Sequence, residues 1–210
     1  MSEQVSRRYH HGDLRAALIE EGVSLARAGG PAAVILREAA RRAEVSHNAG
    51  YRHFASREAF LDAVAARGMA ALAGAMEDAI TAVTGDLDTL AAAQARLAAV
   101  GSAYVDFALA EPGLFRTAFA TRQAPAADGG DPEARGPRGL DPFQLLVRTL
   151  DDLAAAGGIP AERRAHSEMV AWASVHGLAS LLLDGPLRGT DRAEVDRMWD
   201  RVRDAVIRGM

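Results

Sequence analysis

Apolar residues recur at three- and four-residue steps along most of the chain, which is the spacing of one face of an α-helix. The pattern predicts a first helix over residues 13–27, ended by the glycines and proline of residues 29–31. It predicts a short helix beginning at Pro112 and longer helices over residues 57–83, 87–110, 142–156, 161–183 and 191–207. No segment of convincing length alternates with the period of two that marks a β-strand. The sequence therefore predicts an all-α fold.

Residues 36–61 hold two short helical patterns separated by a tight turn, followed by the start of a third helix. Ser46 and Ser56 each stand where the hydroxyl of an N-cap residue can accept a hydrogen bond from a free backbone amide. Between Arg37 and Arg57 there are five arginines and two acidic residues, a local charge of +3 in a chain whose net charge is −4. A helix-turn-helix with a basic outer face places a recognition helix in the major groove of DNA. This segment therefore favours a transcriptional regulator.

Eight residues of this segment are candidate DNA contacts. His47 and Asn48 begin the second short helix, where they can bond base edges or, alternatively, serve only as solvated cap residues. Tyr51 and His53 can bond phosphates or instead tie their helix to the first one. The full set is Arg37, Ser46, His47, Asn48, Tyr51, Arg52, His53 and Arg57.

Other basic residues leave two alternatives open. Arg41 and Arg42 suit either a phosphate contact or a solvated helix face. The N-terminal segment is expected to be either an arm that reaches a minor groove or a disordered tail. Its basic residues are Arg7, Arg8, His10 and His11.

Composition narrows the class of protein. The 210 residues are 49% hydrophobic and 25% charged, which suffices for a sizeable core in one or two domains. The absence of cysteine excludes disulfides, thiolate metal sites and thiol nucleophiles. The N-terminus lacks the apolar core of a signal peptide, and no run approaches the roughly eighteen apolar residues that span a bilayer. We therefore expect a cytoplasmic protein without a membrane partner.

Charge is distributed unevenly along the chain. Residues 1–68 hold ten arginines and eight acidic residues (+2), and the remainder holds fourteen arginines and twenty acidic residues (−6). A weakly basic unit on an acidic body fits DNA binding by one part only. We expect a DNA-binding domain over residues 1–58 and a second domain over residues 59–210. Residues 123–139, rich in Pro, Gly, Ala and Asp, are predicted to be mobile.

The segment from Leu14 to Val64 resembles the TetR family of bacterial repressors. The similarity rests on the Ala16-Ala17 pair, LREAARRA from Leu36, VS at Val45, YRHF from Tyr51 and SREAF from Ser56. Residues 103–119, AYVDFALAEPGLFRTAF, and residues 172–177, WASVHG, resemble the ligand-binding domain class that carries a Trp-x-x-x-His-Gly motif.

This resemblance implies a three-helix DNA-binding domain followed by a helical bundle for ligand binding and dimerisation. It implies a homodimer that binds a palindromic operator in double-stranded DNA. The same resemblance implies release of the operator when a small-molecule effector, which the sequence does not identify, enters the C-terminal domain.

Two positions depart from the pattern of the family. The family usually places Ser or Thr at the start of the second helix, where this chain has Ile35, which cannot cap. It also favours glycine in the turn, where this chain has Glu44. A residue in that turn usually needs a positive φ, which glycine adopts freely.

The C-terminal half contains the candidate ligand contacts. Trp172 and His176 are one helical turn apart and share a face, so they can offer a stacking surface and a polar group to a ligand. Phe107 and Phe115 complete the set, and a purely structural core role is the alternative for all four. Phe119 leaves the same choice open between the core and a cavity wall. Two chains are expected to pair through the last two long helices, by Leu178, Leu181, Leu182, Val195, Met198, Val202 and Val206.

A helical-bundle enzyme, or a structural adaptor without DNA binding, is the competing interpretation. A di-iron enzyme needs paired Glu-x-x-His segments on facing helices, and this chain has one such segment, from Glu44 to His47, in the turn. No glycine-rich phosphate loop, nucleophile elbow or zinc-protease motif is present. An adaptor would not explain a helix-turn-helix lined with arginine. We therefore predict a regulator that is not an enzyme and needs no cofactor.

Overall fold

The computed structural model describes residues 11–120 and 131–209 of the chain. Within these residues the chain forms ten α-helices and two 3-10 helices joined by loops. No strand occurs within these residues, so the predicted all-α fold is confirmed. In chain order the elements are α1 (His11–Gly29), η1 (Pro31–Ala33), α2 (Leu36–Arg42), α3 (His47–Tyr51), α4 (Arg57–Thr81), α5 (Leu90–Ala110), α6 (Pro112–Ala118), η2 (Pro132–Ala134), α7 (Pro142–Ala155), α8 (Ala161–Arg164), α9 (Ser167–Leu183) and α10 (Arg192–Gly209).

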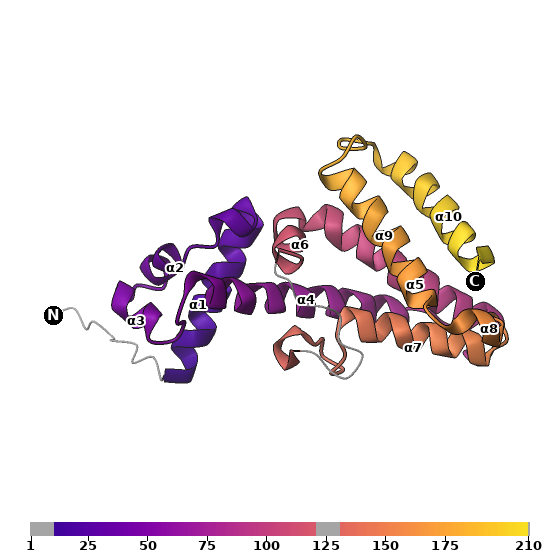
Figure 1. Cartoon of the computed structure of the whole chain (residues 1–210), viewed down its shortest axis with the longest axis horizontal. Helices are drawn as coiled ribbons and strands as arrows, with labels where there is room; N and C mark the ends of the chain where they lie inside the picture. The colour runs from indigo at the N-terminus through magenta and orange to yellow at the C-terminus, as the bar shows by residue number, and fades with distance from the viewer. Residues whose placement is uncertain (1–10, 121–130, 210) are drawn as a thin grey trace.

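The helices form two groups that α4 connects (Figure 1). Helices α1 to α3 lie at one end of the molecule, and α5 to α10 form the larger group at the other end. Phe60 and Val64, near the start of α4, are buried in the core of the first group. Leu72 and Met76, further along α4, are buried in the core of the second group. The proposed domain boundary between residues 58 and 59 therefore falls within one continuous helix, and it remains a prediction.

Helix α4 is also long and apolar enough, by length and composition, to cross a membrane. Half of the relevant window is buried inside the fold, however, and the helix contacts α1, α5, α6 and α7. A helix that is apolar on most sides is expected where two cores share it. The hydropathy of α4 is thus explained by its central place in the fold.

Serine caps begin α3 and α4. The Oγ atom of Ser46 accepts a hydrogen bond from the backbone N–H of Ala49 at 3.2 Å, and that of Ser56 accepts one from Ala59 at 3.1 Å. Both predicted caps are confirmed, and each is worth about 1 kcal/mol. Helix α2 follows Ile35, whose side chain makes no cap hydrogen bond.

The prediction of one continuous helix over residues 161–183 is wrong, because two separate helices, α8 and α9, occupy this range. Helix α8 ends at Arg164, and His166, with a φ of 64°, precedes α9. The Arg164 guanidinium bonds the carboxylates of both Asp151 in α7 and Glu168 in α9. These contacts stabilise a sharp turn, which the spacing of apolar residues does not predict.

The segment before α7 is better ordered than its composition suggests. Of the residues predicted to be mobile, 131–139 form η2 and a turn packed against α4. Ala134 is buried, and the backbone N–H of Arg138 donates to both carboxylate oxygens of buried Glu77 at 3.1 Å. The prediction is therefore wrong for this part, while residues 123–130 lie outside the described ones.

Candidate DNA-binding surface and ligand cavity

The short helix α3 presents its polar side chains to solvent. His47, Asn48 and Tyr51 are exposed, whereas Ala49 and Gly50 are buried. The rings of His47 and Tyr51, one turn apart, lie 4.7 Å from each other between centroids. The exposed face of α3 therefore combines hydrogen-bonding groups with a small aromatic surface.

The arginines around α3 fall into two groups. Arg41 and Arg42 donate to the Glu38 carboxylate, at 2.7 Å and 3.0 Å. These bonds, chiefly the one from Arg41, lower the pKa of Glu38 to about 2. No salt bridge within the described part of the chain engages the other three exposed arginines, which are Arg37, Arg52 and Arg57. Their charge stays available to phosphates.

The chain turns inward after α3. Phe54 is buried, with its ring 5.0 Å from that of Phe60, and the Arg15 guanidinium lies 5.4 Å from the Phe54 centroid. His53 is half-buried, whereas Tyr51 is 45% exposed. Tyr51 is therefore the more accessible of the two candidate phosphate contacts.

The turn between α2 and α3 contains a left-handed residue. Glu44 has a φ of 56°, which confirms the predicted positive φ. Its N–H donates to the carbonyl of Arg41 at 3.2 Å, and the N–H of Val45 donates to the carbonyl of Ala40 at 3.0 Å. These are the two bonds of a Schellman motif, whose left-handed position usually belongs to glycine.

All eight predicted DNA contacts lie on α2, on α3 and its flanking residues, or at the start of α4. Arg37 and His47 border one hollow between α2 and α3, together with Ile35, Glu38, Arg41 and Val45. The predicted N-terminal arm lies outside the residues whose side chains are described. Contact of these residues with DNA remains a prediction.

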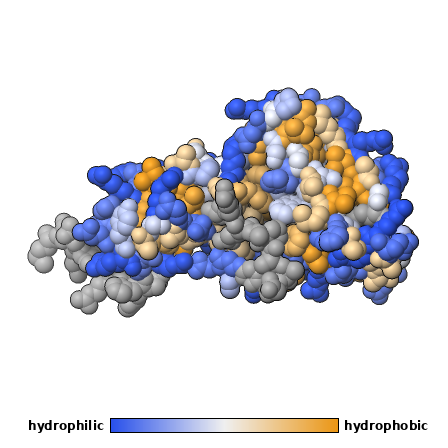
Figure 2. Space-filling model, viewed as in Figure 1, coloured by the Kyte–Doolittle hydropathy of each residue, from blue (hydrophilic) through white to orange (hydrophobic). Residues whose placement is uncertain are grey.

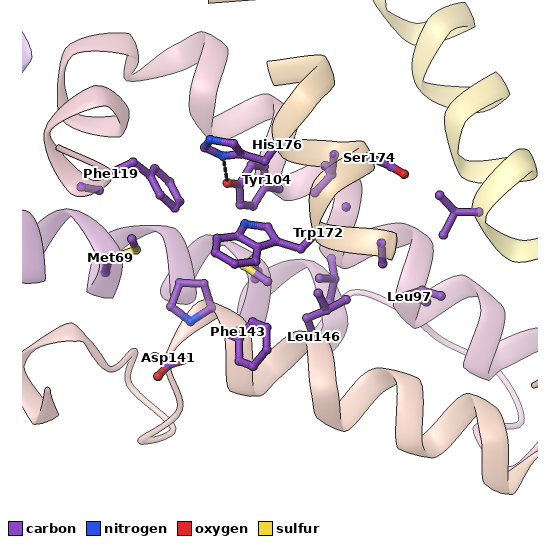
Figure 3. Close-up of a pocket in the computed structure, with 18 of the residues that line it drawn as sticks. Met69, Leu97, Tyr104, Phe119, Asp141, Phe143, Leu146, Trp172, Ser174 and His176 are labelled. Carbon is purple, nitrogen blue, oxygen red and sulfur yellow. Dashed lines mark hydrogen bonds between the residues drawn. The ribbon is translucent and has the colours of Figure 1, made fainter. Parts of the chain in front are cut away.

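A cavity of about 340 Å³ lies inside the larger group of helices. Its volume is at the lower end of the range for small-molecule sites, about 300–1,000 Å³. Most of the wall is aliphatic or aromatic, as the residues around Trp172 in Figure 3 show. The larger apolar side chains in the wall include Met69, Leu97, Phe119, Phe143, Leu146 and Trp199.

One polar pair interrupts this apolar wall. The Tyr104 hydroxyl and the Nδ1 atom of His176 are 2.7 Å apart, the dashed contact in Figure 3. Burial raises the pKa of Tyr104, an effect that the Trp172 side chain only partly opposes, and burial lowers the pKa of His176. Both side chains are therefore neutral near pH 7.

The four predicted ligand contacts are divided between the cavity and the core. Trp172 and His176 line the cavity. Phe115 is buried behind His176, with the two rings stacked at 28° and 5.9 Å between centroids. Phe107 packs against both cores and is absent from the cavity wall. The structural alternative thus describes the placement of Phe107 and Phe115.

Other lining residues escaped the sequence analysis because they come from separate segments. Tyr104 and Phe143 belong to α5 and α7, and only the fold brings them together, whereas Phe119, at the end of α6, is the one of the three weighed phenylalanines that lines the cavity. Trp199 enters from α10, and a Cβ added to Gly101 would lie 2.2 Å from its ring. A glycine within a helical pattern can mark such a close approach, and this was the one usable signal.

The two groups of helices touch through more than α4. The start of α6 packs directly on the end of α1, because a Cβ added to Gly113 would lie 2.2 Å from the carbonyl oxygen of Ala26. Two salt bridges also connect the groups: Arg27 pairs with Glu111 at 3.0 Å, and Arg15 pairs with Glu133 at 2.8 Å. A displacement of helices in one group can therefore be transmitted to the other group through these contacts.

Comparison with known proteins accounts for both groups. Residues 18–64 match bacterial regulatory proteins of the tetR family, and residues 97–206 match the tetracyclin repressor-like C-terminal domain. No curated protein matches the sequence. A solved protein of unknown function from Rhodococcus sp. RHA1 is 35% identical, with a TM-score of 0.74, over 98% of this chain and 99% of that one.

Two further solved structures share the fold at lower identity. A TetR variant from Acinetobacter baumannii AYE, in complex with minocycline, is 18% identical, with a TM-score of 0.62 over 96% of each chain. A regulatory protein of the tetR family from Rhodococcus RHA1 is 19% identical, with a TM-score of 0.56 over 92% of this chain and 96% of that one.

The C-terminal match, residues 97–206, spans more than half of the 210 residues. It does not name the Trp-x-x-x-His-Gly class, which remains a prediction. Together with the helix-turn-helix match and the all-helical architecture, it confirms the resemblance found in the sequence. The chain belongs to the TetR family of transcription regulators.

Proposed function

We propose that this chain is a bacterial, cytoplasmic repressor that binds a palindromic DNA operator as a homodimer and is released by a small-molecule effector. Membership of the family favours a regulator rather than an enzyme. The observation that carries the DNA-binding role is the set of exposed arginines without salt bridges, Arg37, Arg52 and Arg57, around the exposed polar face of α3.

Base recognition is assigned to the first turn of α3. His47 and Asn48 stand at the end of the helix that contacts base edges in helix-turn-helix proteins. Asn can pair with the edge of adenine, and His can bond guanine. Tyr51 and the three arginines then contact phosphates, which position the helix but carry no sequence information.

An apolar stripe on the outer face of α9 supports the homodimer. Met169, Val170 and Leu181 are 47%, 52% and 44% exposed, and Ala173 and Gly177 lie between them at helical spacing. No atom comes within 4 Å of a Cβ added to Gly177. Figure 2 shows hydrophobic side chains at the surface on the side that holds α9 and α10. Such a stripe suits close packing against a second helix.

We propose that the interface uses mainly other residues of the last two long helices than the apolar pattern indicates. Of the seven apolar residues predicted to form it, Leu181 alone is exposed. The other six pack against the bundle itself: Leu178, Leu182, Val195, Met198, Val202 and Val206. We therefore place the interface on the α9 stripe, with α10 beside it. Pairing there would hold two recognition helices about 34–36 Å apart, or a multiple of that distance.

Effector release needs a path from the cavity to the DNA-binding helices. Met69 and Met76 of α4 line the cavity, as do Asp131 and Ala134 on either side of Glu133, the residue that bonds Arg15. A ligand that fits only one arrangement of these elements shifts the population toward that arrangement. The minocycline complex of the related A. baumannii protein supports a small-molecule effector.

Fluorescence anisotropy with DNA from upstream of the gene tests this function. The parent protein should bind that fragment more tightly than a shuffled one, with an affinity that falls as salt rises. Asn48→Ala should cost ~1–3 kcal/mol on the specific fragment alone and relax the preference at one base pair. Equal binding to both fragments by the parent would reject sequence-specific regulation, and an unchanged consensus for Asn48→Ala would reject its role in base recognition.

A further inference from the structure

The charged residues in the cavity wall are already engaged by their own elements. The Asp141 carboxylate accepts a hydrogen bond from the N–H of Gln144 at 2.8 Å and so caps α7. Asp131 caps η2, and Arg203 pairs with Asp200 at 2.7 Å. Among the described residues that line the cavity, the one arginine is therefore paired, and the two aspartates use their carboxylates to bind backbone amides of their own elements.

Two side chains in the wall form a hydrogen bond, Tyr104 and His176, and its direction follows from their chemistry (Figure 3). A phenol O–H is a stronger hydrogen-bond donor than an imidazole N–H, and the unprotonated ring nitrogen of a neutral imidazole is a stronger acceptor than a phenol oxygen. We therefore infer that Tyr104 donates its hydrogen to the Nδ1 atom of His176, 2.7 Å away. A neutral imidazole that accepts at Nδ1 carries its hydrogen on Nε2.

The Nε2–H of His176 is therefore a donor, and no acceptor for it exists among the described residues. His176 is half-buried and lines the cavity beside the aromatic rings of Phe119 and Trp172. Phe143 meets Trp172 edge-on, 5.8 Å away between centroids. The cavity thus offers aromatic surfaces together with one unused hydrogen-bond donor.

We propose that the effector is an uncharged, mainly hydrophobic small molecule that carries an aromatic ring and a hydrogen-bond acceptor, such as a ketone carbonyl, for the Nε2–H of His176. This rests on the proposed function, because it specifies the chemistry of the effector in the same cavity. The ring packs among Phe119, Phe143 and Trp172. A carboxylate would lose its hydration and find no unpaired cation in the described wall. An ammonium group would lose its hydration and meet only Asp131 and Asp141, whose carboxylates already bind backbone amides.

Three probes of nearly equal shape isolate each part of this chemistry. 2-Acetonaphthone carries a ketone, 2-isopropenylnaphthalene replaces the ketone by an alkene, and 2-naphthoate replaces it by a carboxylate. Binding can be followed by tryptophan fluorescence, because the two tryptophans of the chain, Trp172 and Trp199, both line the cavity. The ketone should bind about fivefold more tightly than the alkene. It should bind at least about tenfold more tightly than the carboxylate.

Two substitutions of His176 test the donor. His176→Phe keeps an aromatic ring without the N–H, so the ketone and the alkene should bind equally to it. His176→Gln retains an amide N–H and should keep a preference for the ketone. Helix content from circular dichroism confirms that both variants fold. A ketone preference that survives in His176→Phe would overturn the assignment to Nε2.

Binding of the three probes to the parent protein, measured in the absence of DNA, tests the remaining parts of the inference. The inference is overturned if no probe quenches the tryptophans, if the alkene binds as tightly as the ketone, or if 2-naphthoate binds as tightly as either. Operator binding is measured separately. If the ketone binds selectively but leaves the operator complex intact, the cavity chemistry stands and effector release, as part of the proposed function, fails.

Discussion

The Arg15 guanidinium in α1 donates two hydrogen bonds, of 2.8 Å and 3.1 Å, to the Glu133 carboxylate in η2, 118 positions later in the chain. Arg15 also lies over the ring of Phe54, at the end of the helix-turn-helix. On either side of Glu133, Asp131 and Ala134 line the cavity. Because the pair is exposed, it contributes at most about 1 kcal/mol to stability. Its consequence is a connection between the cavity wall and the DNA-binding helices.

Breaking this pair should weaken the coupling between ligand and DNA. Glu133→Gln should reduce the factor by which saturating 2-acetonaphthone lowers operator affinity, and should change the free energy of unfolding by less than about 1 kcal/mol. Operator titrations with and without the ketone measure that factor. Glu20→Gln is the matched control, because Glu20 pairs with Arg67 at 2.9 Å and neither residue lines the cavity. An equal factor in parent and Glu133→Gln would exclude this segment from the coupling.

Sequence patterns predicted the local structure well where one residue decides the backbone. Ser46 and Ser56 each supply a hydroxyl that caps a helix, and Glu44 adopts the positive φ that its place in the turn requires. The polar pair of the cavity is different. Tyr104 and His176 are 72 positions apart, and no periodicity relates them. Only the packing of α5 against α9 brings them together.

Periodicity also does not say which neighbour covers an apolar face. Val195 and Val202 in α10 stand at helical spacing, which suits an interface between chains, but they pack against the core of their own chain. The exposed stripe on α9 contains Gly177 and Ala173, which are too small to stand out in an apolar pattern. The choice between core and interface therefore required the tertiary structure.

Removal of a phosphate contact should act equally on all DNA sequences. Arg57 is exposed, begins α4 and forms no salt bridge within the described chain, so Arg57→Ala should lower the log–log salt slope of binding by about 1 per half-site. Binding isotherms at several salt concentrations provide the slope. Arg67→Ala, on the same helix but paired with Glu20, should leave it unchanged. Identical slopes for parent and Arg57→Ala would show that this arginine does not contact a phosphate.

A charge on the α9 stripe should separate the proposed dimer. Gly177→Glu meets no neighbouring atom within the single chain, so the fold should persist while the two helices can no longer approach closely. Light scattering should give the mass of one chain, 22.1 kDa, in place of two. Ala71→Glu, on the exposed face of α4, serves as the control and should stay dimeric. A dimeric Gly177→Glu would move the interface away from this stripe.

Ligand binding should respond to acid through His176. Burial holds its pKa below the ordinary 6.5, so the neutral donor persists above that pH and protonation occurs only at lower pH. Affinity for 2-acetonaphthone should be flat from pH 8 to about 6.5 and fall below it, because protonation charges the cavity. The stability that neutral His176 contributes has the same sign: it is complete above about pH 6.5 and is lost as the pH falls through the lower folded value.

The same titration in His176→Gln isolates this group. Tyr104 and Trp172 face His176 from within the cavity, and Asp131, Asp141 and Arg203 are the charged residues in the wall. All of these remain in the variant, so the difference between the two pH profiles reports His176 alone. Parallel profiles would show that its protonation does not govern binding.

Glu44 combines two unfavourable features that a single substitution removes. Its φ of 56° costs a residue other than glycine roughly 1–2 kcal/mol. Its exposed carboxylate also stands in the turn before the recognition helix, where it opposes the surrounding positive charge. Glu44→Gly should therefore raise the thermal midpoint and tighten operator binding. The greater flexibility of glycine in the unfolded chain offsets the gain in stability by about 0.4–1 kcal/mol.

Glu44→Gln separates the two causes, because it removes the charge and keeps a side chain at the left-handed position. It should tighten operator binding about as much as Glu44→Gly does, without the rise in thermal midpoint. For both variants the gain in affinity should shrink as salt rises, since screening weakens the repulsion between the carboxylate and the phosphates. Operator titrations at two salt concentrations and thermal melts of the three proteins distinguish the effects. Equal affinity of all three at low salt would mean that the Glu44 carboxylate faces away from DNA, and equal midpoints for Gly and Gln would mean that the turn accepts glutamate without strain.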